Sequence, residues 1–320
     1  MTAAREPPAG PVFVCMDVPE QPFLVRDAKK FGLGRRRRER LQADGVLVQP
    51  VRGVLMRADD EADPVVRAAA IGLALPEGAA VCGPVAAWLH GVDPRAPWQR
   101  NDPLTLECVV PRGCEPCDLP GVVSHVDLLD PADVVAVDGL PVTSVERTAL
   151  DAARTLAPHM ALAVLDAMAR RAMVDPEVLA VRIEEWRRRR GVAQARRLIA
   201  LCDGRSESFG ESWLRLRLID AGFPGAEPQI WIFDENGVAL YRLDLGWPEL
   251  KIGVEYDGLE FHETPEQRRH DIARRDELPD RFGWNVVGVD RGEVLGRSLT
   301  LERGVGAMLG LAPQITRRLW

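Results

Sequence analysis

Two short segments near the C-terminus constrain the fold of this 320-residue chain more than any other feature. Residues 241–245 and 251–258 both alternate apolar and polar side chains, which is typical of strands with one buried face. Trp247-Pro248-Glu249 stands between them, and proline favours a turn there. We therefore predict a β-hairpin that belongs to a larger sheet.

The hairpin brings carboxylates to one face of the sheet. If it is centred between Glu249 and Leu250, Asp244 lies directly opposite Glu255, and Asp257 shares the same face. Carboxylates held this close repel each other unless a cation neutralises them. Because oxygen ligands suit Mg²⁺ or Mn²⁺, the pattern predicts a divalent metal site that activates water.

A third carboxylate stands on a predicted helix before the hairpin. This helix starts near Ser208 and continues to Gly222, with Glu211 in its first turn. Glu211 is a candidate metal ligand beside the sheet. Ser208 and Glu211 also have the spacing of a helix capping box, and the two roles do not exclude each other.

Residues 206–295 resemble the PD-(D/E)XK nuclease superfamily, and within it the very-short-patch-repair-type (Vsr-like) endonucleases. Several spaced motifs agree in order: the Glu211 helix, the Asp244 strand, the strand ending Val254-Glu255-Tyr256-Asp257-Gly258, Phe261-His262, and a charged helix leading into Phe282-Gly283-Trp284-Asn285-Val286-Val287. The resemblance implies a mixed sheet flanked by helices, and hydrolysis of phosphodiester bonds with Mg²⁺ or Mn²⁺.

The resemblance also assigns roles to individual residues. Asp244 would be the principal metal ligand, with Glu255 as the second ligand and Glu211 in support. His262 would act on water or on the leaving group, whereas Asp257 stands where the family's E-x-K motif has lysine. With Lys251 as a substitute for that lysine, the candidate catalytic set is Asp244, Glu255, Asp257, His262, Glu211 and Lys251. Phosphate contacts would come from Arg274 and Arg275.

Basic residues are concentrated near the N-terminus. The chain carries a net charge of −7, yet residues 26–57 hold ten basic and three acidic residues, a local charge of +7. Arginine supplies all but three of the chain's basic side chains, so only a local cluster of this kind is informative. A solvated arginine face without a partner is the alternative. We expect this cluster to bind DNA through Arg35, Arg36, Arg37, Arg38, Arg40 and Arg52.

The same region predicts a winged helix. A short helix around Leu24, a glycine break at residues 32–34, a second helix over residues 35–43 and two strands around Arg52-Gly53 follow in that order. Four arginines begin the second helix, and this end enters the major groove in helix-turn-helix proteins. Together with Leu89-His90-Gly91 and residues 139–148, this N-terminal region resembles AbiEi-type antitoxin regulators.

The middle of the chain alternates helical and strand patterns. Residues 64–92 are expected to be helical, and residues 104–110 and 122–126 to form short strands. Ser144 is the predicted N-cap of a helix over residues 145–156. These elements predict a mixed α/β region between the arginine cluster and the hairpin.

Composition excludes some classes of protein. Apolar residues make up 46% of the chain and charged residues 28%, an ordinary globular mixture. No window of eighteen apolar residues predicts a membrane span, and residues 1–10 do not read as a secretory signal, so we expect a cytoplasmic protein. Cys114 and Cys117 form a lone Cys-x-x-Cys motif near His125, which we interpret as loop cysteines in preference to a zinc site.

The expected fold class is α+β or α/β in three parts. These are a winged helix over residues 1–60, a mixed α/β antitoxin-like domain over 61–203, and the PD-(D/E)XK nuclease-like domain over 204–320. The main functional hypothesis is a Mg²⁺-dependent endonuclease that the winged helix targets to double-stranded DNA. The alternative is a non-catalytic, DNA-binding transcriptional regulator of AbiEi antitoxin type with a degenerate nuclease domain. An RNA substrate and the oligomeric state are left open.

Overall fold

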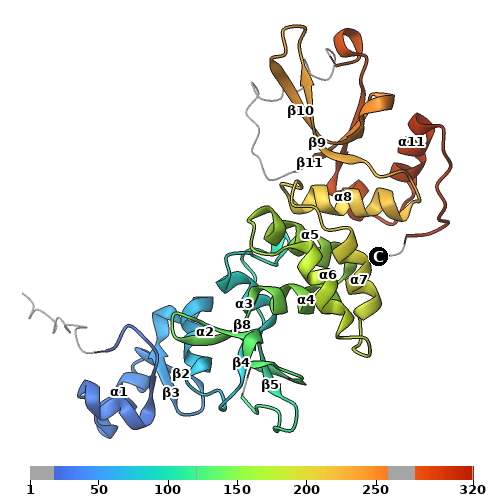
Figure 1. Cartoon of the computed structure of the whole chain (residues 1–320). Coiled ribbons are helices and arrows are strands. Elements are labelled where there is room, and N and C mark those ends of the chain that lie inside the picture. The colour runs from blue at the N-terminus through green and yellow to red at the C-terminus, as the bar shows by residue number, and fades with distance from the viewer. Residues whose placement is uncertain (1–17, 120, 259–277, 319) are drawn as a thin grey trace, which may run out of the picture. The chain divides into compact units, whose positions relative to one another are not determined.

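The computed structural model of the chain describes residues 18–119, 121–258, 278–318 and 320 (Figure 1). These residues form a mixed α+β structure with three separate sheets. They divide into two compact units, one with the described residues up to Val85 and Pro103–Val142, the other with Ala86–Asp102 and the described residues from Thr143 onwards. The three-part division at residues 60 and 203 stays a prediction.

A three-stranded antiparallel sheet and two helices form the N-terminal region. The strands lie in the order β1 (Phe23–Leu24), β3 (Val54–Arg57) and β2 (Leu47–Val51). Between β1 and β2 the chain forms the 3-10 helix η1 (Val25–Phe31) and the helix α1 (Arg35–Ala43). The helix predicted around Leu24 begins only at Val25, because Phe23 and Leu24 pair with β3 as strand β1. The second helix and the two strands follow in the predicted order, while the winged-helix assignment itself stays a prediction. A small apolar core contains Val18, Phe23, Ala28, Leu33, Leu47 and Leu55.

A five-stranded mixed sheet follows in the same unit. Its order is β6 (Val122–Asp127), β5 (Leu106–Pro111), β4 (Ala80–Cys82), β8 (Leu140–Thr143) and β7 (Val134–Val137). Strand β4 runs antiparallel to β5, whereas β5 pairs with β6 and β4 with β8 in parallel. The accompanying helices are η2 (Ala58–Asp60), α2 (Pro64–Gly72) and η4 (Pro131–Asp133).

The prediction of continuous helix over residues 64–92 is wrong. Helix α2 ends at Gly72, and the chain then enters β4, the middle strand of the sheet, before α3 (Gly83–Leu89) begins. Gly78 adopts a φ of 79° in the turn before β4, a conformation that favours glycine. The short apolar run Ala80-Val81-Cys82 has no periodicity of its own, so its strand conformation depends on the neighbouring strands.

Four helices pack around one apolar core in the second unit. They are α4 (Val145–Thr155), α5 (Pro158–Arg170), α6 (Pro176–Glu184) and α7 (Val192–Ala200). Ser144 caps α4 as predicted, because its Oγ accepts a hydrogen bond from the backbone N–H of Arg147 at 3.2 Å. No helix in the described part of the chain has the length and apolar character that a membrane crossing requires.

Helix α8 (Phe209–Asp220) packs against a four-stranded mixed sheet in the same unit. The strand order is β12 (Asn285–Asp290), β11 (Ile252–Asp257), β10 (Ala239–Trp247) and β9 (Glu227–Phe233), with β12 parallel to β11 and the other pairs antiparallel. Leu245 pairs with Val254, which is the register of the predicted hairpin. Short elements complete this unit: η3 (Pro97–Gln99), η5 (Pro248–Leu250), the π-helix η6 (Leu278–Phe282), α10 (Arg291–Leu295) and α11 (Thr300–Leu309).

A buried ion pair joins α8 to α11. Arg217 Nε donates to Glu302 Oε1 at 2.7 Å, and Arg217 Nη2 donates to Glu302 Oε2 at 2.8 Å. The two side chains are 2% and 0% exposed, and Arg217 Nη1 also donates to the carbonyl of Val294 at 2.7 Å. These further hydrogen bonds offset the loss of hydration of the buried guanidinium.

Candidate nucleic-acid interface and acidic site

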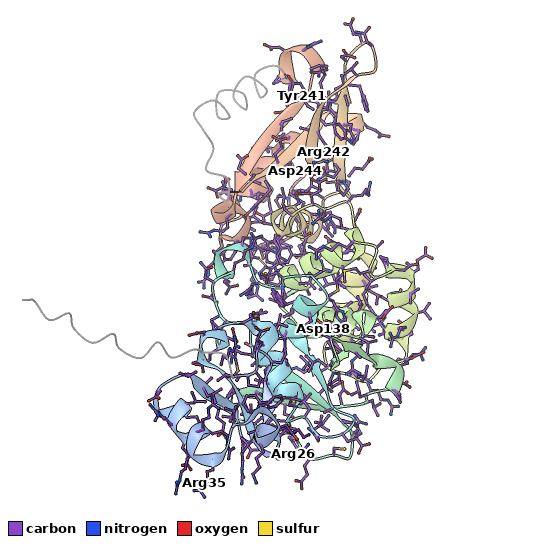
Figure 2. The ribbon with its side chains drawn as sticks, turned by 90° about the vertical axis from the view of Figure 1, so that its left-hand side faces the viewer. Arg26, Arg35, Asp138, Tyr241, Arg242 and Asp244 are labelled. Atoms are coloured by element: carbon purple, nitrogen blue, oxygen red, sulfur yellow. The ribbon has the colours of Figure 1, made fainter. Side chains whose placement is uncertain are left out.

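Helix α1 presents arginine side chains to solvent. Gly32 ends η1 in the left-handed conformation, with φ 69°, and Gly34 lies immediately before α1, so a glycine-containing break separates the two helices. No side chain of α1 is buried. Figure 2 shows the Arg35 side chain pointing away from the ribbon of its unit. The exposed arginines of the helix are Arg35, Arg36, Arg37 and Arg40.

These arginines oppose the dipole of their own helix. The first turn of α1 contains four consecutive arginines and no acidic residue. Positive charge at a helix N-terminus costs roughly 0.3–1 kcal/mol per charge. Glu39 offsets part of this cost, because Arg35 Nε donates to its carboxylate at 2.8 Å. These arginines weaken the helix, so binding of an anion explains their presence in the first turn better than helix stability does.

The hairpin of β2 and β3 adds another exposed arginine. Arg52 and Gly53, whose φ is 84°, form its turn, and the Arg52 side chain is exposed. Two other arginines of the region are less exposed. Arg38 is half-buried, and Arg57 Nη2 donates to the carbonyl of Val18 at 2.7 Å. The surface available to an anion is therefore smaller than the +7 segment.

A second arginine run, residues 187–190, has different surroundings. It follows α6, which ends at Glu184, and precedes α7. Arg187 Nε lies 3.7 Å from the carboxylate of Glu184, and the guanidinium of Arg189 lies 3.9 Å from the ring centre of Trp186. Side chains of the same unit therefore engage this run, which makes it a useful comparison for α1.

Glu211 is buried near the start of α8, where it accepts two hydrogen bonds. Its Oε2 accepts from the backbone N–H of Glu207 and from Nε2 of Gln229, both at 2.8 Å. Ser208 caps the helix, with its Oγ accepting from the N–H of Glu211 at 3.2 Å. Glu211 thus accepts the hydrogen bond of the backbone N–H that precedes the N-cap Ser208. Through Gln229 it also contacts strand β9.

Gln229, Asp244 and Glu255 lie in one row across β9, β10 and β11. Asp244 is half-buried, Glu255 is 8% exposed, and Asp244 Oδ2 accepts from the backbone N–H of Tyr256 at 2.8 Å. The prediction that Asp244 lies opposite Glu255 agrees with this register. Asp244 lies opposite Gln229 because the pairs on either side of it are Leu243 with Ile230 and Leu245 with Pro228. It lies opposite Glu255 because the next pair along the hairpin is Leu245 with Val254.

Gln229 is the residue of this row that sequence reasoning missed. It has a φ of 56°, in the left-handed region that non-glycine residues rarely adopt. Its Oε1 is buried and has no hydrogen-bond partner within the described part of the chain. Strained backbone is common at functional sites. The sequence carries no signal for Gln229, because its conformation depends on pairing with β10.

Two of the predicted carboxylates, Asp244 and Glu255, lie in the row and Glu211 lies on α8, and the three do not form a compact site. Within the described residues, oxygen atoms of Glu211, Asp244 and Glu255 do not all lie within 4.8 Å of one another. Asp257 is exposed at the end of β11, beside Asp290 of β12. The set of Glu211, Asp244 and Glu255 as metal ligands stays a prediction.

Four predicted site residues remain, and the structure describes one of them, Lys251. Lys251 precedes β11, at the opposite end of that strand from Asp257, and its Nζ donates to the carbonyl of Phe282 at 2.8 Å. The interaction holds Lys251 at a distance along the strand from the row of carboxylates. The remaining three lie outside the described residues: His262, Arg274 and Arg275.

Two sequence motifs of the middle region contact each other. His90 Nε2 lies 2.7 Å from the carbonyl oxygen of Thr143, which joins the end of α3 to the end of β8. The hydroxyls of Thr143 and Thr148 are hydrogen-bonded at 2.8 Å in the buried interior. Arg147 is 1% exposed and pairs with Asp151 at 2.8 Å. These polar side chains therefore have structural partners.

Comparison with known families places the antitoxin resemblance in the middle of the chain. Residues 79–201 match the family described as AbiEi antitoxin C-terminal domain. The match includes Leu89-His90-Gly91 and residues 139–148, and it lies within residues 61–203, which were expected to be antitoxin-like. It does not extend to the N-terminal arginine region, where the AbiEi resemblance stays a prediction. The match does not identify the expected Vsr-like domain, which stays a prediction.

Two relatives come from Mycobacterium tuberculosis. They are "Uncharacterized protein MT2308" of strain CDC 1551 / Oshkosh and "Uncharacterized protein Rv2248" of strain ATCC 25618 / H37Rv. Each is 32% identical to this chain over 246 residues, which cover 77% of this chain and 86% of the relative. The chain therefore belongs to the family of these two mycobacterial proteins, with a match to the AbiEi antitoxin C-terminal domain at its centre.

Proposed function

We propose that this protein is a DNA-binding transcriptional regulator of the AbiEi antitoxin type. The observation that carries the proposal is the exposed arginine surface of α1, together with Arg52 in the neighbouring hairpin. Phosphate groups are the abundant anions that such a surface binds, and release of their counterions drives the binding. The match of residues 79–201 to an antitoxin domain supports the regulatory role.

The proposed mode of binding is that of a winged helix. In this interpretation, η1 and α1 are the helix-turn-helix pair, and β2 with β3 is the wing. The N-terminal end of α1 would enter the major groove, where Arg35 and Arg36 reach base edges or phosphates. Arg52 would contact the phosphate backbone beside it. Because major-groove contacts of this kind depend on B-form geometry, duplex DNA is the proposed partner in preference to duplex RNA.

Binding to matched nucleic acids tests this proposal. The full chain is titrated against fluorescent DNA and RNA duplexes of the same sequence, with Mg²⁺ and Mn²⁺ omitted to prevent hydrolysis. We expect binding to DNA that weakens steeply as salt rises, and weaker binding to RNA. Equal affinity for both duplexes would contradict major-groove binding, and failure to bind either at low salt would contradict nucleic-acid binding altogether.

A second candidate, a metal-dependent endonuclease, rests on the row of Gln229, Asp244 and Glu255. Helix α8 and strands β10, β11 and β12 follow one another in the order of the motifs on which the nuclease resemblance rests. Phe261-His262 and most of the charged helix of that resemblance lie outside the described residues. Buried carboxylates and an amide oxygen are ligands of the kind that Mg²⁺ prefers. The chemistry of these ligands therefore fits Mg²⁺. Among the described residues, however, the carboxylate oxygens of Glu211, Asp244 and Glu255 do not all lie within 4.8 Å of one another.

In this candidate, Asp244, Glu255 and Glu211 would hold the ion, with the amide oxygen of Gln229 beside them. A divalent cation at such a site supplies Lewis-acid stabilisation of phosphate and a more acidic water. The hydrogen bonds from the N–H of Glu207 and from Nε2 of Gln229 would keep the buried Glu211 carboxylate oriented toward the sheet. Asp244 accepts from the N–H of Tyr256, which fixes one of its two oxygens.

Nicking of supercoiled plasmid distinguishes the two candidates. The assay compares the unaltered chain with Asp244→Asn, in Mg²⁺ or in chelator. An endonuclease nicks only with Mg²⁺ and loses activity in Asp244→Asn. A regulator leaves the plasmid intact under every condition while binding it. Equal nicking by both proteins would indicate a contaminating nuclease and remove support from this second candidate.

A further inference from the structure

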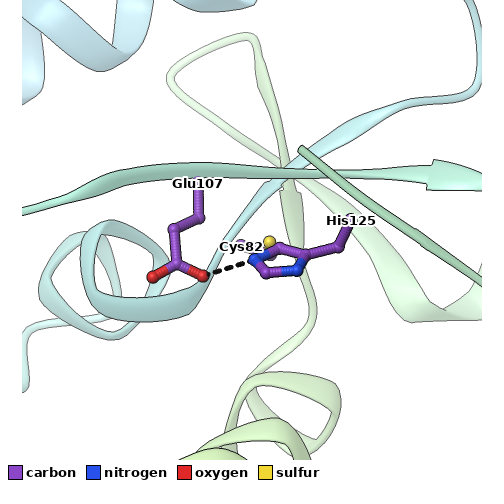
Figure 3. Close-up of side chains that lie close together, drawn as sticks. All are labelled: Cys82, Glu107 and His125. Atoms are coloured by element: carbon purple, nitrogen blue, oxygen red, sulfur yellow. Dashed lines mark hydrogen bonds and ion pairs between the residues drawn. The ribbon is translucent and has the colours of Figure 1, made fainter. Parts of the chain in front are cut away.

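Three potential metal ligands meet on one face of the five-stranded sheet. Cys82 ends β4, Glu107 lies in β5 and His125 lies in β6. One ligand atom of each residue, the thiol sulfur, a carboxylate oxygen and a ring nitrogen, lies within 4.8 Å of the other two. Figure 3 shows the three side chains pointing toward one another. They all belong to the first compact unit.

The strand register brings these residues together from distant positions in the sequence. Cys82 pairs with Glu107 across β4 and β5. His125 pairs with Val109, two residues along β5 from Glu107, so it projects from the same face. Its Nε2 lies 2.7 Å from Glu107 Oε2. Exposure increases across the group, from 5% for Cys82 to 23% and 48% for the side chains of Glu107 and His125, which leaves a path from solvent.

Gly83 makes room for the carboxylate of this group. It has a φ of 65°, and a Cβ added there would lie 2.8 Å from both Cδ and Oε2 of Glu107. An alanine at this position would therefore strain the backbone and displace the carboxylate. The absence of a side chain at Gly83 therefore leaves the space that the Glu107 carboxylate occupies beside His125.

We propose that Cys82, Glu107 and His125 bind one Zn²⁺ ion, with solvent in the fourth position. Thiolate, imidazole and carboxylate are together typical zinc ligands, and thiolate disfavours Mg²⁺. Bond lengths of about 2.0–2.3 Å in a tetrahedral site put ligand atoms roughly 3.3–3.8 Å apart. The three atoms reach that geometry with small side-chain rotations, and the ion replaces the proton between His125 and Glu107.

This site differs from the cysteine pair that the sequence suggested. Cys114 is exposed, and burial raises the pKa of the Cys117 thiol, which keeps it protonated. His125 instead lies beside Cys82, which is 43 positions earlier in the sequence. The proposed ion would join three neighbouring strands of the sheet, β6, β5 and β4. All three ligands lie within residues 79–201, the part of the chain that matches the antitoxin domain.

The test measures zinc binding by the full chain with a chromophoric zinc chelator as competitor. We expect one Zn²⁺ per chain and a loss of affinity of at least about tenfold in Cys82→Ser, Glu107→Gln and His125→Ala, since even removal of partners outside the first shell costs that much. Cys114→Ser is the matched control, because it removes an exposed thiol of the same unit, and it should bind zinc unchanged.

Cobalt binding tests the site in the unaltered chain, so the result does not depend on whether a variant folds. Co²⁺ added to the unaltered chain should produce a thiolate-to-metal charge-transfer band and the visible bands of a tetrahedral ion, and Zn²⁺ should displace both. Absence of stoichiometric zinc binding, or a cobalt spectrum without the thiolate band, would overturn the proposal. So would a Cys114→Ser variant that loses as much zinc affinity as Cys82→Ser.

Discussion

The arginine surface makes a quantitative prediction for DNA binding. The perturbation is the double variant Arg36→Ala/Arg52→Ala, which removes one exposed arginine from α1 and one from the turn of the β2–β3 hairpin. Both side chains are exposed, so their removal should leave folding intact. Arg35 is left in place because it pairs with Glu39, and its loss would also release that carboxylate.

The expected loss follows from counterion release. Each phosphate contact adds about 0.9 to the slope of log affinity against log salt, so each contact contributes about eightfold at roughly 0.1 M salt relative to 1 M. Losing two contacts should lower the slope by about 1.8 and the affinity about 60-fold, or about 2.5 kcal/mol. Fluorescence anisotropy with a labelled duplex over a range of salt concentrations measures both quantities.

The control is Arg187→Ala/Arg188→Ala, which makes the same charge change in the other arginine run. Its side chains are also exposed, but they lie outside the proposed interface. We expect the control to keep the slope and nearly all the affinity. The reasoning fails if Arg36→Ala/Arg52→Ala binds DNA with an unchanged slope, or if the control loses as much affinity, since binding would then reflect total charge.

Three further predictions concern the second unit. Glu302→Ala should lower the free energy of unfolding by about 3–5 kcal/mol in urea titrations, because it leaves Arg217 buried without its carboxylate; a change below about 1 kcal/mol would refute this. Burial lowers the pKa of His159 to about 4 from its ordinary 6.5, so stability should fall as pH drops from about 6.5 to 4, by about 1–2 kcal/mol after allowance for partial exposure. His159→Phe should remove this loss of stability, and a variant with the same pH profile as the unaltered chain would contradict the prediction. Gly210→Ala should cost about 1–3 kcal/mol, because its methyl group would overlap the ring of Tyr256; calorimetry that finds no drop in Tm would contradict this.

Local chemistry explains which parts of the fold could be predicted. Pro248 and the alternation on either side of it fixed the β10–β11 hairpin in its observed register, because turn and pattern act over a few residues. Ser144 was likewise recognisable as a helix cap. Strand β4 was missed because three apolar residues have no period, and its conformation depends on β5 and β8.

The same distinction between local patterns and strand pairing applies to the candidate sites. Exposed arginines on α1 follow from a charge run with glycine breaks, which a sequence displays directly. The meeting of Cys82, Glu107 and His125 depends on the register of three strands that lie far apart in the chain, so no spacing in the sequence indicates it. Gln229 was missed for the same reason, since its strained backbone is a property of the assembled sheet.

Sequence-specific binding is the central claim, because a transcriptional regulator must distinguish its site from other DNA. Selection from a pool of random DNA duplexes with the full chain tests it most directly, without Mg²⁺ or Mn²⁺ and at a salt concentration that weakens non-specific contacts. We predict that the pool converges on a common sequence, and that Arg36→Ala/Arg52→Ala binds this sequence more weakly than the unaltered chain does. A pool that stays random through repeated rounds would contradict the account.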